Sequence, residues 1–448
     1  TTASGNTAVG KDALLDNTTG ANNVAVGENA LANNTTADQN TAVGQNALLT
    51  STTAADNIAI GHDAMRLTTT GGNNVGIGVD ALRANTTGNT NVAVGQNTLQ
   101  ANTEGDRNVA IGYQSLALMN PSSDSDTYNV AVGYNSGYAI TTGEKNTVVG
   151  SLALDANDVG SRNVAIGYAT LTSYNPASAV DSYNTAVGYA ALTNATTGNY
   201  NTAIGGLALD ANTTADNNTA LGYSALLLNT TGAYNTAVGA NALDANTTGV
   251  NNTGIGQSAL GANTTASNNI AIGYSALGVN TTGDQNVVVG NYAADASTTA
   301  LRTVAVGVEA LTAQTTGSNN TALGHTTLTS IQSGSDNIGI GYAANCAHDS
   351  ANSITIGVNI TGVGNYFKFG KASNVVSNQF TSDASWARSS DVHKKTNIED
   401  DTLGLDFIND LRTVKFNWRP NSEFPKHYDD YSETENHMDT ETRLHGMI

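Results

Sequence analysis

Short apolar segments of five residues recur along most of the chain. Each has Asn or another small polar residue first, Thr, Val or Ile second, usually Ala or Gly third, an aliphatic residue fourth and Gly fifth, as in residues 23–27. Successive segments are mostly 17 residues apart, and we count 21 copies up to residue 357. Self-similarity at such a period is typical of solenoid proteins. The repeat therefore dominates any prediction of the fold.

The alternation of branched and small side chains within each segment predicts a short β-strand. Its second and fourth residues share one face, which we expect to point into a core. The third residue, such as Ala8 or Gly76, then lies on the opposite face, where only a close neighbour would require so small a side chain. The pattern thus predicts strands that are packed on both faces.

A bulky apolar residue follows each strand, as at Leu14, Leu31 and Met65. Its spacing allows either a second short strand or a single helical turn. The polar connection after it, such as residues 32–36, has turn chemistry because Asn and Gly tolerate positive φ and Asn and Thr side chains bond local backbone. One unit therefore predicts one coil, and 21 coils stacked about 4.7 Å apart predict a rod of roughly 100 Å. The expected fold class is all-β: an elongated β-solenoid or β-roll.

Two units carry four extra residues, around Met119-Asn120-Pro121 and Asn175-Pro176, and the later register is undisturbed. Insertions of this kind lie in surface loops. They are either contact loops or ordinary tolerated variation.

Composition excludes several classes of function. Charged residues make up 12% of the chain and the formal net charge is -20, so neither nucleic acid nor anionic membrane is an expected partner. The single cysteine, Cys346, excludes an intrachain disulfide and cysteine-based zinc sites, and is expected to be buried. Histidine spacings fit no metal motif, phosphate loops are missing and no carboxylate pair stands out. We predict no cofactor, no metal and no enzyme acting on an external substrate.

The repeat resembles the head repeats of trimeric autotransporter adhesins, whose Asn-x-Ala-x-Gly pentads build a left-handed parallel β-roll. The resemblance covers roughly residues 1–357. In that family three chains pack side by side through small residues. It therefore implies a homotrimer in which the Ala and Gly positions are contacts between chains.

The composition changes after Gly357, because all six Phe and both Trp residues lie beyond it. Residues 358–389 alternate enough to be strands that cap the shaft, which would protect the last edge of the solenoid. Beyond them lie residues 386–398 (WARSSDVHKKTNI), an apolar helix-like run at 403–411, residues 412–418 (RTVKFNW) and residues 445–448 (HGMI).

These motifs resemble the start of the intramolecular chaperone domain of phage endosialidase tailspikes and related fibres, a self-cleaving family. The resemblance implies three segments: a shaft at 1–357, a transition at 358–389 and the first part of a small α+β chaperone domain at 390–448, expected to be truncated. It makes Ser390 the nucleophile, Lys395 the general base and Ser389–Ser390 the cleaved bond. A desolvated lysine can lose its proton and activate a hydroxyl. Taken alone, Ser390 could equally be a helix N-cap and Lys395 a solvated charge.

The sequence thus predicts a structural protein of a viral tail fibre or surface fibre. Its expected partners are two further copies of itself and a host surface receptor, with a saccharide as one candidate, and its expected location is the virion surface. One alternative is a bacterial adhesin or filament on the cell surface. Another is an ice-binding solenoid, in which Thr-Thr pairs such as Thr18-Thr19 form a regular array. The chain starts inside the repeat pattern, at Thr1, so we expect a fragment or a processed product.

Overall fold

The computed structural model describes residues 3–123, 125–381, 387–388, 413–416 and 444–447. The chain divides into two compact units, Thr1–Ser389 and Ser390–Ile448. In the second unit the structure describes one antiparallel pair, β31 (Thr413–Phe416) with β32 (Leu444–Met447). Among all described residues there is no helix, and hence none long and apolar enough to cross a membrane. The residues expected to form the helix-like run at 403–411 lie outside the described part.

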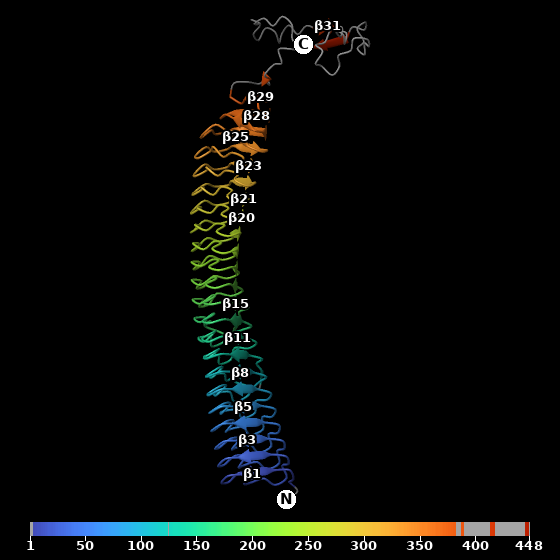
Figure 1. Cartoon of the computed structure of the whole chain (residues 1–448), viewed down its shortest axis with the longest axis vertical. Helices are drawn as coiled ribbons and strands as arrows, with labels where there is room; N and C mark the ends of the chain where they lie inside the picture. Colours follow the sequence, from blue (N-terminus) through green and yellow to red (C-terminus); the bar gives the residue numbers. More distant parts are fainter. Residues whose placement is uncertain (1–2, 124, 382–386, 389–412, 417–443, 448) are drawn as a thin grey trace. The chain divides into compact units, whose positions relative to one another are not determined.

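The first unit is a stack of coils, each contributing one short strand to a continuous parallel sheet (Figure 1). Pairing is in register at the period of the repeat: Thr7 of one coil lies opposite Val24, and Val24 lies opposite Thr41. The strands are β1 (Thr7–Val9), β2 (Val24–Val26), β3 (Thr41–Val43), β4 (Ile58–Ile60), β5 (Val75–Ile77), β6 (Val92–Val94), β8 (Val109–Ile111), β10 (Val130–Val132), β11 (Thr147–Val149), β13 (Val164–Ile166), β15 (Thr185–Val187), β16 (Thr202–Ile204), β17 (Thr219–Leu221), β18 (Thr236–Val238), β19 (Thr253–Ile255), β20 (Ile270–Ile272), β21 (Val287–Val289), β22 (Val304–Val306), β23 (Thr321–Leu323), β24 (Ile338–Ile340) and β26 (Ile354–Val358). The predicted all-β solenoid of about 21 coils is confirmed.

The core lies on the other face of the strand from the one expected. Ala25, the third residue of its repeat, is fully buried, whereas Val24 and Val26 on either side of it remain partly exposed. The same alternation holds along the sheet from β2 onward. The expectation that the second and fourth residues face the core is therefore wrong. So is the expectation that the Ala and Gly positions contact other chains, because these positions point into the coil.

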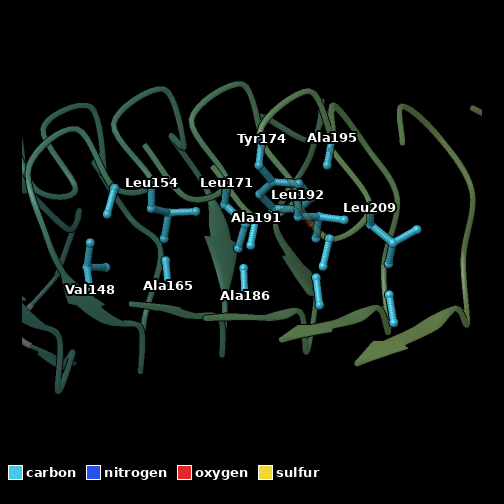
Figure 2. Packing of buried hydrophobic residues seen from close by; sticks show 14 of the residues in the cluster. Val148, Leu154, Ala165, Leu171, Tyr174, Ala186, Ala191, Leu192, Ala195 and Leu209 are labelled. Carbon is cyan, nitrogen blue, oxygen red and sulfur yellow. The ribbon is translucent and has the colours of Figure 1, made fainter. Parts of the chain in front are cut away.

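The reason is the narrowness of each coil. The interior is filled by the bulky residue of the turn, so the strand opposite mostly offers Ala or Gly, although β11 and β21 bury a Val there. A Cβ added to Gly76 would lie 2.7 Å from Cγ of Met65 in the preceding coil, and one added to Gly254 would lie 3.3 Å from Cγ of Leu243. Figure 2 shows the arrangement: the alanines of the strands face a row of leucines from the turns. Such a core stays close-packed along its whole length.

The bulky residue belongs to neither a second strand nor a helical turn. Leu31 has a φ of 50° and Asn29, two residues before it, a φ of 59°, so the turn contains two left-handed residues. The turns nevertheless stack, because the Leu31 amide donates to the Ala47 carbonyl of the next coil at 3.0 Å. Left-handed backbone is unfavourable for a branched side chain. Repetition of the same turn in every coil holds it in place through these coil-to-coil bonds.

One row of buried Asn side chains runs along nearly the whole stack, and a second row, interrupted by other residues, runs beside it. In the first row, Oδ1 of Asn23 accepts from the Asn40 amide of the next coil at 2.9 Å, and Nδ2 of Asn23 donates to the Ala37 carbonyl at 2.8 Å. In the second row, Nδ2 of Asn34 donates to the same Ala37 carbonyl and to Oδ1 of Asn17. Buried backbone groups need such partners. This accounts for the Asn that begins nearly every repeat.

Each inserted loop adds a short second ladder beside the sheet. β7 (Gly105–Asp106) pairs with β9 (Ser125–Asp126), and β12 (Gly160–Ser161) pairs with β14 (Val180–Asp181). The prolines of both loops, Pro121 and Pro176, are buried.

The last coils end in a hairpin. β25 (Ala344–Cys346) pairs with β27 (Ile360–Gly362), and β26 pairs with β28 (Tyr366–Lys371). β28 then turns back into the antiparallel β29 (Asn374–Gln379), which pairs with β30 (Ala387–Arg388). Cys346 is buried, as predicted from the sequence, and burial raises the pKa of its thiol to about 12. A thiol held protonated in this way is unreactive.

Candidate interaction surface

The outward face of the sheet is a long, largely apolar surface, which we call the sheet face. It consists of the second and fourth residues of each repeat. Ile58 and Ile60 of β4 are each 39% exposed and Val9 of β1 is 58% exposed. The fourth residue is aliphatic in every strand of this sheet from β1 to β26. Monomeric soluble proteins rarely expose contiguous apolar patches larger than a few hundred Å². The sheet face is therefore a candidate interface.

Tyrosines border the sheet face on both sides. They occupy the position just before the initial Asn of the repeat or the position just after its Gly. Both positions lie just outside the three-residue strands, and the tyrosines before the Asn have left-handed backbone. Neighbouring rings stack from coil to coil: the centroids of Tyr113 and Tyr134 are 5.5 Å apart, and those of Tyr168 and Tyr189 are 5.7 Å apart. The exposed border tyrosines are Tyr113, Tyr128, Tyr134, Tyr168, Tyr183, Tyr189, Tyr200, Tyr223, Tyr234, Tyr274 and Tyr342.

An arginine, an aspartate and a tyrosine meet beside the first inserted loop. Arg107 forms an ion pair with Asp126, and its guanidinium lies 5.5 Å from the centroid of the Tyr128 ring. The Tyr128 hydroxyl donates to Oδ2 of Asp126 at 3.1 Å. The Asp126 carboxylate thus contacts both the Arg107 guanidinium and the Tyr128 hydroxyl.

The same three residue types meet beside the second loop. Nε of Arg162 lies 2.8 Å from Oδ1 of Asp181, and the guanidinium lies 5.6 Å from the centroid of the Tyr183 ring. Hydrogen bonding to Asp181 raises the pKa of Arg162 above its usual value, so the cation is permanent. The two clusters are three coils apart along the sheet, since β8, β10, β11 and β13 are consecutive neighbours.

The two hydroxyls of a Thr-Thr pair in the turns have different surroundings. The Thr18 hydroxyl donates to the Thr35 carbonyl at 2.8 Å, and the Thr35 hydroxyl donates to the Thr52 carbonyl at 3.1 Å. The first Thr of each pair therefore bonds backbone of the next coil, while the second, such as Thr36, is exposed. This agrees with the turn chemistry inferred from the sequence.

The residues with predicted catalytic roles, Ser389, Ser390 and Lys395, lie outside the described residues. Sequence reasoning missed both the sheet face and the two Arg-Asp-Tyr clusters. A signal for the clusters exists, because RNVAIGY occurs at residues 107–113 and again at 162–168, and each copy is followed by an Asn-Pro loop, then Asp and Tyr. No group of three or more His, Cys, Asp or Glu in the described part could hold a metal ion.

Comparison with known proteins finds no family that matches the chain, and no curated protein or solved structure that is similar to it.

Proposed function

We propose that this chain is the shaft of a homotrimeric fibre, of the kind that viruses use to reach a host surface, and that its C-terminal segment is a chaperone released by cleavage at Ser389–Ser390. The sheet face carries the proposal. It is largely apolar, regular and exposed in the single chain, and no other element of the described residues covers it.

A copy of the same chain is the occupant that fits best. Whatever covers the whole sheet face must offer matching side chains at the spacing of the strands, about 4.7 Å. A second and a third copy, aligned in parallel, present the same spacing over the same length. A stable interface needs about 800 Å² per partner. Each of about 21 strands provides one aliphatic side chain at the fourth position and Val, Ile or Thr at the second, which makes a row long enough to meet this requirement.

Three copies rather than two follow from the resemblance to trimeric adhesin heads and to trimeric phage fibres. Closed rings in which each chain contacts the next are a common form of symmetric assembly. The attachment role and the viral location rest on the C-terminal motifs, with Ser390 as nucleophile and Lys395 as base. A bacterial surface adhesin built from the same modules is the alternative.

Light scattering of the full chain tests the assembly directly. We expect a mass of three chains, and dissociation when Val238, Ile255 and Ile272, the fourth residues of three consecutive repeats, are all changed to Asp. Burying an unpaired charge is costly, so three carboxylates on the sheet face should open the interface. The matched control changes Thr248, Thr265 and Thr282, exposed turn residues of the same coils, to Asp. A monomeric parent chain, or equal effects of the two triple variants, would refute the proposal.

A further inference from the structure

The second inserted loop overhangs a shallow, open hollow at the edge of the shaft. The hollow has a volume of about 540 Å³, within the range of ligand sites, and its lining includes Thr142, Glu144, Val159, Ser161, Val180 and Asp181. Thr142 and Glu144 belong to the turn before β11, so the hollow lies beside the sheet face rather than on it. Assembly through the sheet face would leave it open.

The loop is held firmly. At the start of the loop, the Asn175 amide donates a hydrogen bond to the Thr196 carbonyl at 2.9 Å, and the next residue, Pro176, is buried. Tyr174 is fully buried in the core, where most repeats have Asn, and its hydroxyl donates to Oδ1 of Asn199 at 2.7 Å. The ladder of β12 with β14 fixes the far end of the loop. A site built on such a loop is preorganised, which lowers the entropic cost of binding.

The charges around the hollow balance. Asp181 is paired with Arg162, and Nζ of Lys145 lies 3.0 Å from Oε2 of Glu144. Each carboxylate of the lining thus has a cationic partner just outside it, and the net charge of -20 on the whole chain disfavours an anionic ligand. The lining itself offers two carboxylates and two hydroxyls as hydrogen-bonding groups.

Small apolar side chains lie among these polar groups. Val159 and Val180 are partly exposed in the lining of the hollow. A pyranose ring has this combination of chemistry, with hydroxyls along its edge and C–H groups on its faces. Carboxylates and guanidinium groups make charge-assisted hydrogen bonds to such hydroxyls, and these are stronger than neutral ones.

We propose that this hollow binds a neutral oligosaccharide, with Glu144 and Asp181 accepting hydrogen bonds from sugar hydroxyls and the two valines packing against a ring face. The inference rests on the proposed attachment function. It specifies the class of ligand that the fibre would bind and where on the shaft that ligand would bind.

The first loop offers a matched control. It carries the same Arg-Asp-Tyr cluster, but the position of Val159 is taken there by Glu104, that of Ser161 by Asp106 and that of Glu144 by Asn89. Both the apolar patch and the balance of charge are thereby lost. Equivalent substitutions at the first loop should therefore leave binding unchanged.

The test uses the assembled full chain on an array of neutral gluco-, galacto-, manno- and N-acetylglucosamine oligosaccharides, with sialyllactose as the charged probe, followed by calorimetry of those that bind. We expect neutral oligosaccharides to bind, and Asp181→Ala and Glu144→Gln each to weaken binding about tenfold or more. Asp126→Ala and Asn89→Ala, at the first loop, should retain full affinity.

Three results would overturn the inference. They are no binding of any neutral oligosaccharide, equal affinities of the second-loop and first-loop variants for the sugar, or binding of sialyllactose alone. Light scattering and thermal unfolding of each variant show whether the shaft is intact. An assembled trimer that binds no sugar overturns this inference and leaves the proposed fibre standing, whereas a monomeric parent chain overturns the fibre itself.

Discussion

Gln314 takes over the hydrogen bonds that an Asn makes in most other coils. Its Nε2 donates to the Thr303 hydroxyl oxygen at 2.9 Å and also to the Gly317 carbonyl. Elsewhere that carbonyl position accepts from two asparagines, as Ala215 does from Asn201 and Asn212. Thr303 is too short to reach the carbonyl, so the longer Gln side chain compensates for it.

The pair should therefore be energetically coupled. Gln314→Asn alone should destabilise this coil by about 1 kcal/mol, because one buried hydrogen bond is lost. The double change Thr303→Asn, Gln314→Asn should recover most of that stability, since it recreates the arrangement of the other coils. The measurement is a double-mutant cycle on hydrogen exchange of the Val304 amide, which reports local opening. Strictly additive effects would show that the two side chains do not act together.

The buried Asn row should control the pairing of adjacent coils. Oδ1 of Asn218 accepts from the Asn235 amide at 2.9 Å, and its Nδ2 donates to the Gly232 carbonyl. Asn218→Ala leaves the buried Asn235 amide without a partner, at a cost of about 1–3 kcal/mol, whereas the Gly232 carbonyl keeps its hydrogen bond from Asn229. We expect hydrogen exchange of the Asn235 amide to accelerate strongly. Thr231→Ala, at an exposed turn position of the same coil, is the control and should change little.

The orientation of the strand can be tested with two neighbouring residues of β17. Ala220 is fully buried and Thr219 is exposed. Ala220→Leu should overpack the coil and cost about 1–3 kcal/mol, whereas Thr219→Leu should leave the coil intact. Thermal unfolding followed by circular dichroism distinguishes the two. If Thr219→Leu were the more damaging change, the core would lie on the opposite face.

Four aspartates should make the shaft more stable in mild acid. Burial raises the pKa of Asp155, Asp210, Asp244 and Asp295, which occupy the same turn position in four coils. The folded chain then binds more protons than the unfolded chain at pH values just above the ordinary aspartate pKa. Stability should therefore fall as pH rises through the raised pKa values of these groups.

Melting temperatures measured between pH 4 and pH 7 test this expectation. The midpoint should be higher at the acid end of that range. Changing the four residues to Asn should flatten the dependence, because Asn does not titrate. A quadruple variant with the same pH profile as the parent chain would assign the effect to other groups.

Cleavage at Ser389–Ser390 is tested by intact mass. We expect the parent chain to lose everything from Ser390 onward, and Ser390→Ala and Lys395→Ala to stay whole, because the first removes the nucleophile and the second its base. A serine elsewhere, such as Ser377 of β29, provides the control substitution. Equal processing of the parent chain and Ser390→Ala would show that a different bond or an external protease is responsible.

The repeat period, the number of coils and the strand positions could all be predicted from the sequence, because each coil carries the same local pattern and pairs only with its neighbours. The direction in which Val24 and Val26 point could not. Alternation defines two faces but does not say which of them is inside. Composition suggested the more apolar face, and the structure shows the opposite.

The sequence by itself therefore determined the architecture: a Gly after nearly every strand, an Asn before nearly every strand and a spacing of mostly 17 residues suffice to define stacked coils. Only the tertiary structure decided the interior. Once Leu31 and its equivalents turn inward on left-handed backbone, the coil has room for Ala25 and not for Val24, so the branched residues must face outward. The folding of the second inserted loop against the coil likewise brings Asp181 beside Arg162. These contacts depend on the width of the coil and on the path of a loop, and neither is encoded in the period of the repeat.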